Sequence, residues 1–272
     1  KNNSPIIDCV NSILKFHPDD YIVIVDSYSD DTSYFDLIPK IPNVKILNVK
    51  NNNYEIGALW KTYEQYPNES VYVLIQDTVI IKHSLSEFLE NDDSYTFLYF
   101  DELIQSSLNS KFFENTSYNF PKDNYVIPMC FGSNVILKNK IIKKFIEKRL
   151  HSSFLPTSKL ESQYSERMIG FIMHSENIDL HKNNLDGNCL TDWSKFHNDG
   201  YKYIKKIFSL YHTFHIYHIF ISMRPTLKEE DRKVKITITL NPEINKRMED
   251  ELTNKSKLIE KLQSKFTNYE QQ

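Results

Sequence analysis

Two uninterrupted apolar runs constrain the fold of this chain more than any other feature of its sequence. Residues 21–25 read Tyr-Ile-Val-Ile-Val and residues 71–75 read Val-Tyr-Val-Leu-Ile. β-Branched and aromatic residues favour strands, and a continuous run, unlike an alternating one, is typical of a strand covered on both faces. The sequence therefore predicts a sheet sandwiched between helices, and it argues against a sheet with one face in water.

Further helices and strands fill the intervals around these runs. Helical spacing and short apolar runs predict two helices and two strands, at residues 5–16, 54–66, 44–49 and 96–100. This alternation predicts an α/β fold with a mostly parallel central sheet flanked by helices. In such sheets ligands bind beyond the carboxyl ends of the strands, and both long runs end there in a polar turn, at Asp26 and at Asp77.

The last third of the chain has a different character. Residues 201–223 are aromatic and contain three histidines, which predicts a helix or a pair of helices packed in the core, with contact to a membrane surface as the less favoured alternative. Val234–Leu240 alternates strictly, as a half-exposed strand does. From residue 243 the apolar spacing is that of heptads, which favours helix pairing. We therefore divide the chain into a domain at 1–227 and an extension at 228–272, a strand plus an amphipathic helix that forms either a coiled-coil homo-oligomer or a contact with its own domain.

Composition excludes several functional classes. The chain has only five glycines, and none are spaced as a dinucleotide-binding loop or a P-loop requires. Its net charge of −3 comes from well-mixed charges, so we expect no nucleic-acid partner. Three distant cysteines, without a C-x-x-C pair, argue against a thiolate zinc site or a disulfide framework and favour a cytoplasmic location. No run of eighteen apolar residues indicates a membrane-spanning helix.

Four short stretches, in this order, resemble segments of GT-A glycosyltransferases of the family 2 type. They are a strand with an acidic turn, the start of a helix, a strand that delivers a DXD-like motif, and a small-residue turn: Ile22–Asp31, Asn53–Ala58, Val73–Val79 and Phe131–Asn134. The likeness spans about residues 5–190. In that family a further strand precedes a helix like 5–16, so the resemblance implies that the first strand of the fold is missing here.

The resemblance implies a nucleotide-sugar donor, with a UDP-sugar favoured, and a hydroxyl acceptor on a glycan, a protein or a lipid. The residues it assigns to the donor and to the turn near the acceptor are Asp26, Ser27, Asn53, Tyr54, Glu55, Gly57, Gln76, Gly132 and Ser133. It also implies a divalent cation, Mn²⁺ or Mg²⁺, on Asp77 together with a late histidine, for which we choose His218. The DXD motif is degenerate, because Gln76-Asp77-Thr78 keeps only its central aspartate.

Glu166 is the candidate general base for an inverting, hexosyltransferase-type reaction. The resemblance places an acidic residue near the start of a late helix, and Glu166 matches that place, with Glu161 as its rival. A helix-surface or capping role for Glu166 is the plain alternative. Asp26 has a similar alternative as a turn residue, and Gly57 as a packing residue. At the level of the protein, the alternative is a non-catalytic module that binds a nucleotide or glycan and oligomerises through its C-terminal helix.

Overall fold

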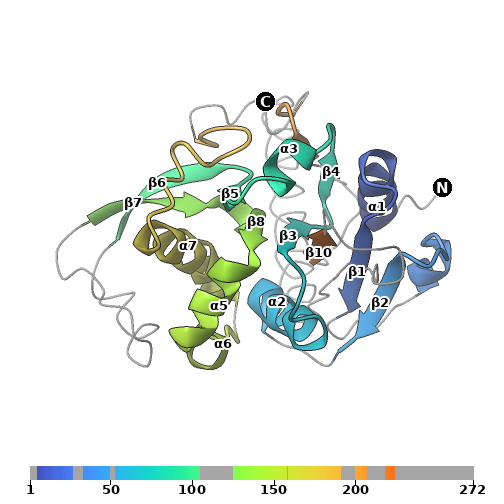
Figure 1. Ribbon diagram of the computed structural model, residues 1–272, viewed down its shortest axis with the longest axis horizontal. Coiled ribbons are helices and arrows are strands. Elements are labelled where there is room, and N and C mark those ends of the chain that lie inside the picture. The colour runs from blue at the N-terminus through green and yellow to red at the C-terminus, as the bar shows by residue number, and fades with distance from the viewer. Residues whose placement is uncertain are drawn as a thin grey trace, which may run out of the picture.

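The computed structural model combines one six-stranded sheet, two small sheets and helices on both faces of the large sheet (Figure 1). The structure describes residues 5–26, 33–49, 53–104, 125–157, 159–190, 200–206 and 218–223. Ser27 and the extension at 228–272 lie outside these residues, as do the predicted strand and the heptad helix of that extension. Within the described chain, no helix has both the length and the apolar character that crossing a membrane requires.

The central sheet has the strand order β2-β1-β10-β3-β8-β5. Its strands are β1 (Tyr21–Asp26), β2 (Val44–Asn48), β3 (Val71–Gln76), β5 (Tyr95–Thr96), β8 (Val135–Lys138) and β10 (His218–Met223). Among the described strands of this sheet, only β1 and β2 pair in parallel, and the other four neighbouring pairs are antiparallel. β1, β2, β3 and β5 nevertheless run in one direction, because β8 and β10 are the two reversed strands. The pairing thus departs from the mostly parallel sheet that the alternation of elements predicts.

β10 fills the centre of the sheet, although it is the last described element of the chain. The prediction of a helix over residues 201–223 is wrong at both described strands of that segment: Ile204–Lys206 pairs with Val79–Ile81, and 218–223 pairs with β1 on one side and β3 on the other. Ile219, Phe220 and Ile221 favour a strand by themselves, and the two antiparallel ladders, each of at least four residues, agree with that preference. The consequence is that two strands from the N-terminal half are joined only through a strand from the C-terminal third.

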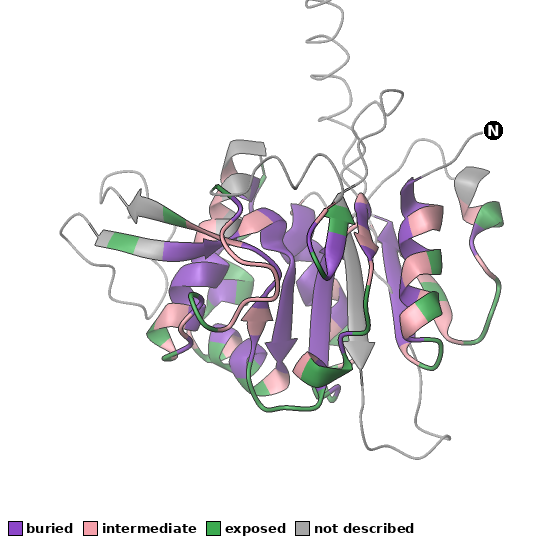
Figure 2. Ribbon diagram, turned by 90° about the horizontal axis from the view of Figure 1, so that it is seen from above, coloured by how far each residue is buried: buried purple, intermediate pink, exposed green. Residues whose placement is uncertain are grey.

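β3 separates two apolar cores. Its residues Val71, Val73 and Ile75 belong to one buried cluster with β1 and the helix α1 (Pro5–Phe16). Tyr72 and Leu74 belong to the other, with the helices α2 (Tyr54–Gln65), α5 (Asn139–Glu147) and α7 (Lys159–Ser175). This period of two, with every position buried, is what a strand covered on both faces requires. β1, β3 and β8 are buried at nearly every position (Figure 2), whereas β2, at one edge of the sheet, is intermediate to exposed.

Helices and two small sheets complete the fold. Their bounds are α1 (Pro5–Phe16), η1 (Ser33–Leu37), α2 (Tyr54–Gln65), β4 (Val79–Ile81), α3 (Ser86–Leu89), β6 (Tyr99–Ile104), β7 (Tyr125–Cys130), η2 (Phe131–Ser133), α5 (Asn139–Glu147), α6 (Leu150–Ser153), α7 (Lys159–Ser175) and β9 (Ile204–Lys206). β4 pairs with β9, and β6 pairs with β7 in a hairpin on the side of the molecule away from β2 (Figure 1). α7 packs closely on β7 because Gly170 lacks a Cβ, which would lie 2.6 Å from the Pro128 carbonyl oxygen.

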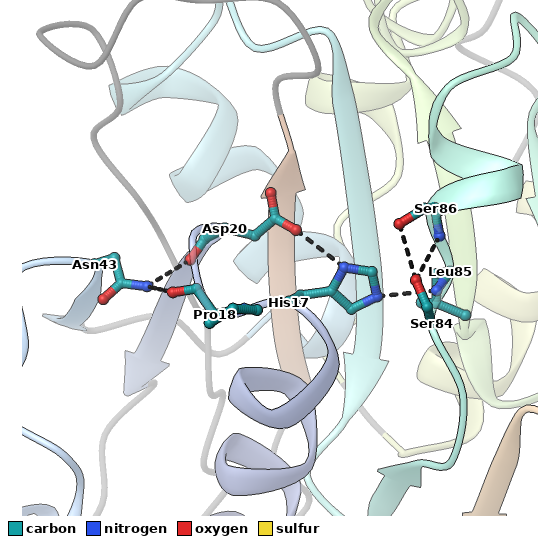
Figure 3. Close-up of polar contacts among 7 residues, drawn as sticks. All are labelled: His17, Pro18, Asp20, Asn43, Ser84, Leu85 and Ser86. Atoms are coloured by element: carbon teal, nitrogen blue, oxygen red, sulfur yellow. Dashed lines mark hydrogen bonds and ion pairs between the residues drawn. The ribbon is translucent and has the colours of Figure 1, made fainter.

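A buried histidine joins the turn after α1 to the segment between β4 and α3 (Figure 3). His17 Nε2 accepts the Leu85 N–H at 2.9 Å, and Nδ1 lies 3.0 Å from the Asp20 carboxylate. Since Nε2 is an acceptor, Nδ1 carries the proton and donates to Asp20. Asn43 Nδ2 donates to the carbonyl groups of Pro18 and Asp20, which ties the β1–β2 connection to the same turn. This contact lies at the amino end of β1, whereas Asp26 is at the carboxyl end of the same strand.

Candidate functional site

Asp26 and Asp77 lie at the same edge of the sheet, one on each side of β10. In the register, Ile219 of β10 is paired with Ile24 of β1 and with Ile75 of β3. Asp26 and Asp77 each follow two residues later, so they occupy the same level of two parallel strands. With two strand spacings between them, their Cα atoms lie about 10 Å apart. The structure therefore brings the two predicted acidic turns together.

Asp77 is the more buried of these two carboxylates, at 1% exposure. It faces the α1 side of the sheet, where burial and then the Asp77 carboxylate raise the pKa of the Cys9 thiol well above its ordinary value. Cys9 Sγ is also 3.9 Å from the Gln76 carbonyl oxygen, to which it donates. A thiol in this state stays protonated, so Cys9 is a weak donor at the edge of the sheet and not a nucleophile.

The Gln76 side chain lies on the other face of the sheet from Asp77, next to the η2 turn. Its N–H donates to Asn134 Oδ1 at 2.8 Å, and Asn134 Nδ2 donates to the Phe131 carbonyl oxygen at 3.2 Å. A Cβ on Gly132 would lie 3.2 Å from the Gln76 side-chain amide and 2.7 Å from Asn134 Nδ2. Glycine is thus required at 132 for space as well as for backbone conformation. We call Gln76, Gly132, Ser133 and Asn134 the amide corner.

The amide corner is built on two consecutive left-handed residues. Gly132 has φ 64° and Ser133 has φ 55°, and the Asn134 N–H closes the turn on the Phe131 carbonyl oxygen at 3.4 Å. Two central residues with positive φ define a type I′ turn, which usually takes glycine or asparagine. A buried serine there costs about 1 kcal/mol. Backbone strain of this kind is concentrated at functional sites, which makes the turn a candidate binding element.

The start of α2 forms a second unusual segment of backbone. Tyr54 opens the helix with φ 53°, a rare conformation for an aromatic residue. Asn53 does not cap the helix with its side chain; its Nδ2 instead donates to the Pro156 carbonyl oxygen at 3.2 Å. The Gly57 N–H donates to the Asn53 carbonyl oxygen at 2.8 Å, and Gly57 itself is buried. The predicted donor segment is therefore fastened to the loop that precedes α7.

Glu55 is a buried carboxylate between α2 and α7. Its exposure is 1%, and Ser162 Oγ of α7 donates to its Oε2 at 2.9 Å. The position in the first turn of α2 favours negative charge, because the helix dipole is positive there. The Glu55–Ser162 contact fixes the predicted donor segment to the helix that carries the candidate base.

Glu166 lies in α7, one helical turn after Ser162, and the structure describes its backbone but not its side chain. Its rival Glu161 has a structural role: Oε2 accepts the Thr157 N–H at 2.7 Å and the Thr157 hydroxyl at 2.9 Å. This is the interaction of a glutamate that caps the start of a helix. Of the two candidate bases, Glu161 therefore already accepts two hydrogen bonds at the amino end of α7.

His218 is the residue of β10 that pairs with Gln76. Its backbone is therefore one position from Asp77 across the ladder, and its side chain lies outside the description. Among the side chains that the structure does describe, no three histidine, cysteine, aspartate or glutamate residues are grouped as metal ligands. A divalent ion here would take most of its ligands from a bound diphosphate, with Asp77 as its described protein ligand.

Sequence reasoning missed three contacts that hold this site together. Asn134 fixes the amide corner to β3, Ser162 receives Glu55, and the Pro156 carbonyl group receives Asn53. Asn134 alone had a sequence signal, since an asparagine after Gly-Ser is typical of a turn. The other two contacts join segments separated by more than 100 residues, which no local pattern indicates.

These segments meet at the carboxyl ends of β1 and β3. Carboxylates lie on the side of β1 and α1, whereas amide groups and the strained turn lie on the side of α2 and α7. Carboxylates accept hydrogen bonds from ribose or sugar hydroxyls, and amides recognise polar ligands without carrying charge. The edge is therefore chemically suited to a polar, hydroxylated ligand. Against known proteins, no family model, no curated protein and no solved structure matches this chain.

Proposed function

We propose that this protein is a GT-A-type glycosyltransferase that moves a sugar from a UDP-sugar to an acceptor hydroxyl. The observation that supports it most is the placement of Asp26 and Asp77 at one level of the same sheet edge. Ligands of sheets with several strands in one direction bind beyond the carboxyl ends of those strands. A nucleotide extended along this edge is long enough to reach both carboxylates.

The proposed roles are those that the glycosyltransferase resemblance implies for these residues. Asp26 accepts hydrogen bonds from the nucleoside, and the Asn53–Gly57 segment lines the donor. Asp77 faces the diphosphate, where a divalent cation bound with the donor would neutralise the charge of the leaving group. The acceptor lies near Gly132 and Ser133.

In the proposed reaction the acceptor oxygen forms a bond to the anomeric carbon while the bond from that carbon to the diphosphate oxygen breaks. The electron pair leaves with the nucleoside diphosphate, and the proton of the acceptor hydroxyl passes to Glu166. This displacement inverts the anomeric centre. Glu55 and Ser162 act as positioning residues, because their hydrogen bond holds α7 beside the donor segment.

One observation favours the second candidate, a non-catalytic module that binds a nucleotide or a glycan. Asp77 is 1% exposed. The free-energy cost of burying this carboxylate must be met by surrounding protein groups when no ligand is bound, so a cation that arrives only with a ligand is not needed to stabilise it. Such a module would use Asp26 and the amide corner to bind, without turnover.

Donor hydrolysis across a panel of UDP- and GDP-sugars tests the proposal. The transferase should release nucleoside diphosphate from one donor class, and Glu166→Gln should lower that rate by about 10² to 10⁴. Glu161→Gln is the matched control, because this glutamate caps α7 and should leave turnover nearly unchanged. Turnover that survives intact in Glu166→Gln removes Glu166 as the base. Binding of a nucleotide without turnover of any donor selects the module.

A further inference from the structure

Basic residues are concentrated on α5 and at the start of α6. Five basic residues occur within ten positions there, although the whole chain has a net charge of −3: Lys140, Lys143, Lys144, Lys148 and Arg149. Four of them are exposed, and Lys148 is half-buried. We call these five residues the α5 basic face.

Helical geometry gathers these charges on one side. Lys140, Lys143 and Lys144 are at positions i, i+3 and i+4, which lie on a single face of a helix. The opposite face, with Ile141, Ile142 and Phe145, is buried in the core beside α2 and α7. The apolar face is fully used by the fold, so only the charged face is available to a partner.

Acidic neighbours reduce this charge only in part. Glu147 lies on the same face and accepts from Lys144 Nζ at 2.8 Å. That hydrogen bond, together with the negative charge of Glu147 and of Glu176, raises the pKa of Lys144. Lys140, Lys143 and Arg149 have no acidic partner among the ion pairs of the described residues.

The α5 basic face runs toward the candidate site. Lys140 and Lys148 are separated by about 12 Å along the helix axis. From Arg149 the chain continues through α6 to Pro156, whose carbonyl group receives the Asn53 side chain. Leu155, 40% exposed, lies at the end of this path. The basic charges therefore border the loop that is fastened to the predicted donor segment.

We propose that the α5 basic face binds an anionic lipid bilayer and thereby holds the candidate site near the membrane surface. Lysine, a point charge on a flexible stem, supplies four of the five charges, whereas recognition of individual phosphates favours arginine. The exposed large apolar side chains of the described chain are aliphatic, so the aromatic platforms of single-strand nucleic-acid binding are not among them. The membrane contact considered above for residues 201–223 concerns a different segment. The proposal holds whether or not the protein transfers sugars.

Co-sedimentation with vesicles tests the proposal without any nucleotide, so its failure is separate from a failure of the transferase. The full chain should bind vesicles that contain about 30% phosphatidylserine, and not pure phosphatidylcholine, at about 0.05 M salt. Binding should disappear at about 0.5 M salt, because charge attraction between exposed groups is screened. Each lysine should contribute about fivefold, so Lys140/Lys143/Lys148→Gln should weaken binding about a hundredfold.

The control is Lys40/Lys45/Lys182→Gln, which changes the net charge equally at exposed lysines outside the face. It should bind vesicles as the parent protein does, and circular dichroism should show that both variants are folded. The single variants Lys140→Gln and Lys143→Gln, each expected to weaken binding about fivefold, replace the triple variant if it does not fold. No binding to anionic vesicles, or equal loss in the control, overturns the proposal. Tighter binding to a single-stranded oligonucleotide than to vesicles of equal phosphate content overturns it as well and assigns the face to nucleic acid.

Discussion

Asp26 is the last residue of β1 and Asp77 directly follows β3, and β10 pairs with both strands so that each aspartate lies two residues beyond the paired row of Ile24, Ile219 and Ile75. Neither carboxylate could be aligned with the other without β10, because β1 and β3 do not pair directly. The relative position of the two candidate ligand-binding groups is thus set by a segment from the C-terminal third of the chain.

Asp26→Asn should weaken UDP binding about tenfold, to the same extent with and without Mn²⁺. Asp26 is proposed to accept from hydroxyl donors, and a hydrogen bond to a charged group contributes about 1.5 kcal/mol. Isothermal titration calorimetry measures the effect. Asp36→Asn is the matched control, since Asp36 is an exposed acidic residue of η1. An Asp26→Asn protein that binds UDP as tightly as the parent would remove Asp26 from the site.

Gly132→Ala should destabilise the protein by about 1–3 kcal/mol. The added Cβ meets Asn134 Nδ2 at 2.7 Å, and the position needs a left-handed backbone. Urea unfolding followed by circular dichroism gives the change in free energy. Ser133→Gly is the control: it relieves left-handed strain while adding chain entropy to the unfolded state, so the net change should stay within about 1 kcal/mol. Equal destabilisation by both variants would contradict the described turn.

His17→Ala should cost about 2–3 kcal/mol, because the buried Leu85 N–H loses its acceptor and a cavity opens beneath α3. His17→Gln should cost less, about 1 kcal/mol, since its amide oxygen can accept from Leu85 and its amide nitrogen can donate to Asp20. Thermal unfolding of the two variants at one pH compares them. Identical losses would show that the imidazole contributes only by packing.

Lys138→Met should change how stability depends on pH. Burial lowers the pKa of Lys138 to about 8, although its Nζ donates to the carbonyl groups of Phe88 and Leu89. Between pH 8 and the ordinary lysine pKa of 10.5 the unfolded chain binds more protons than the native protein, so this group makes stability rise with pH. The rise attributable to Lys138 should be at most about 3 kcal/mol.

The measurement is the difference in unfolding free energy between the parent protein and Lys138→Met at pH 7.5 and at pH 10. The parent should gain stability relative to the variant over this range. A constant difference would mean that the pKa of Lys138 is the same in the native and unfolded states.

The strands that form the site were predictable where burial leaves a dense local signal. Val23, Val25, Val73 and Ile75 mark two strands covered on both faces, and Asp77 follows one of them at the edge where ligands bind. The place of β10 in the sheet was not predictable, because its ladders join it to residues about 150 and 200 positions earlier. Local propensity carries no information on such distant pairing.

The contacts within the candidate site divide in the same way. Gly132 was a sequence candidate because Phe131–Asn134 resembles a small-residue turn of the glycosyltransferases, and in the structure Gly132 has a left-handed backbone conformation. The acceptor of the Ser162 hydroxyl and the partner of the Asn53 side chain were not predictable, since each depends on how α2 and α7 pack. Sequence patterns thus located the pieces of this edge, and tertiary packing decided which pieces touch.

Calorimetric titration with UDP, in the presence and absence of Mn²⁺, tests the proposed site most directly when the parent protein is compared with Asp77→Asn. The proposal predicts that Mn²⁺ strengthens UDP binding to the parent about tenfold or more, and that Asp77→Asn abolishes this gain while retaining the weaker metal-free binding. UDP binding that is absent in the parent, or an Mn²⁺ effect that persists in Asp77→Asn, would contradict it.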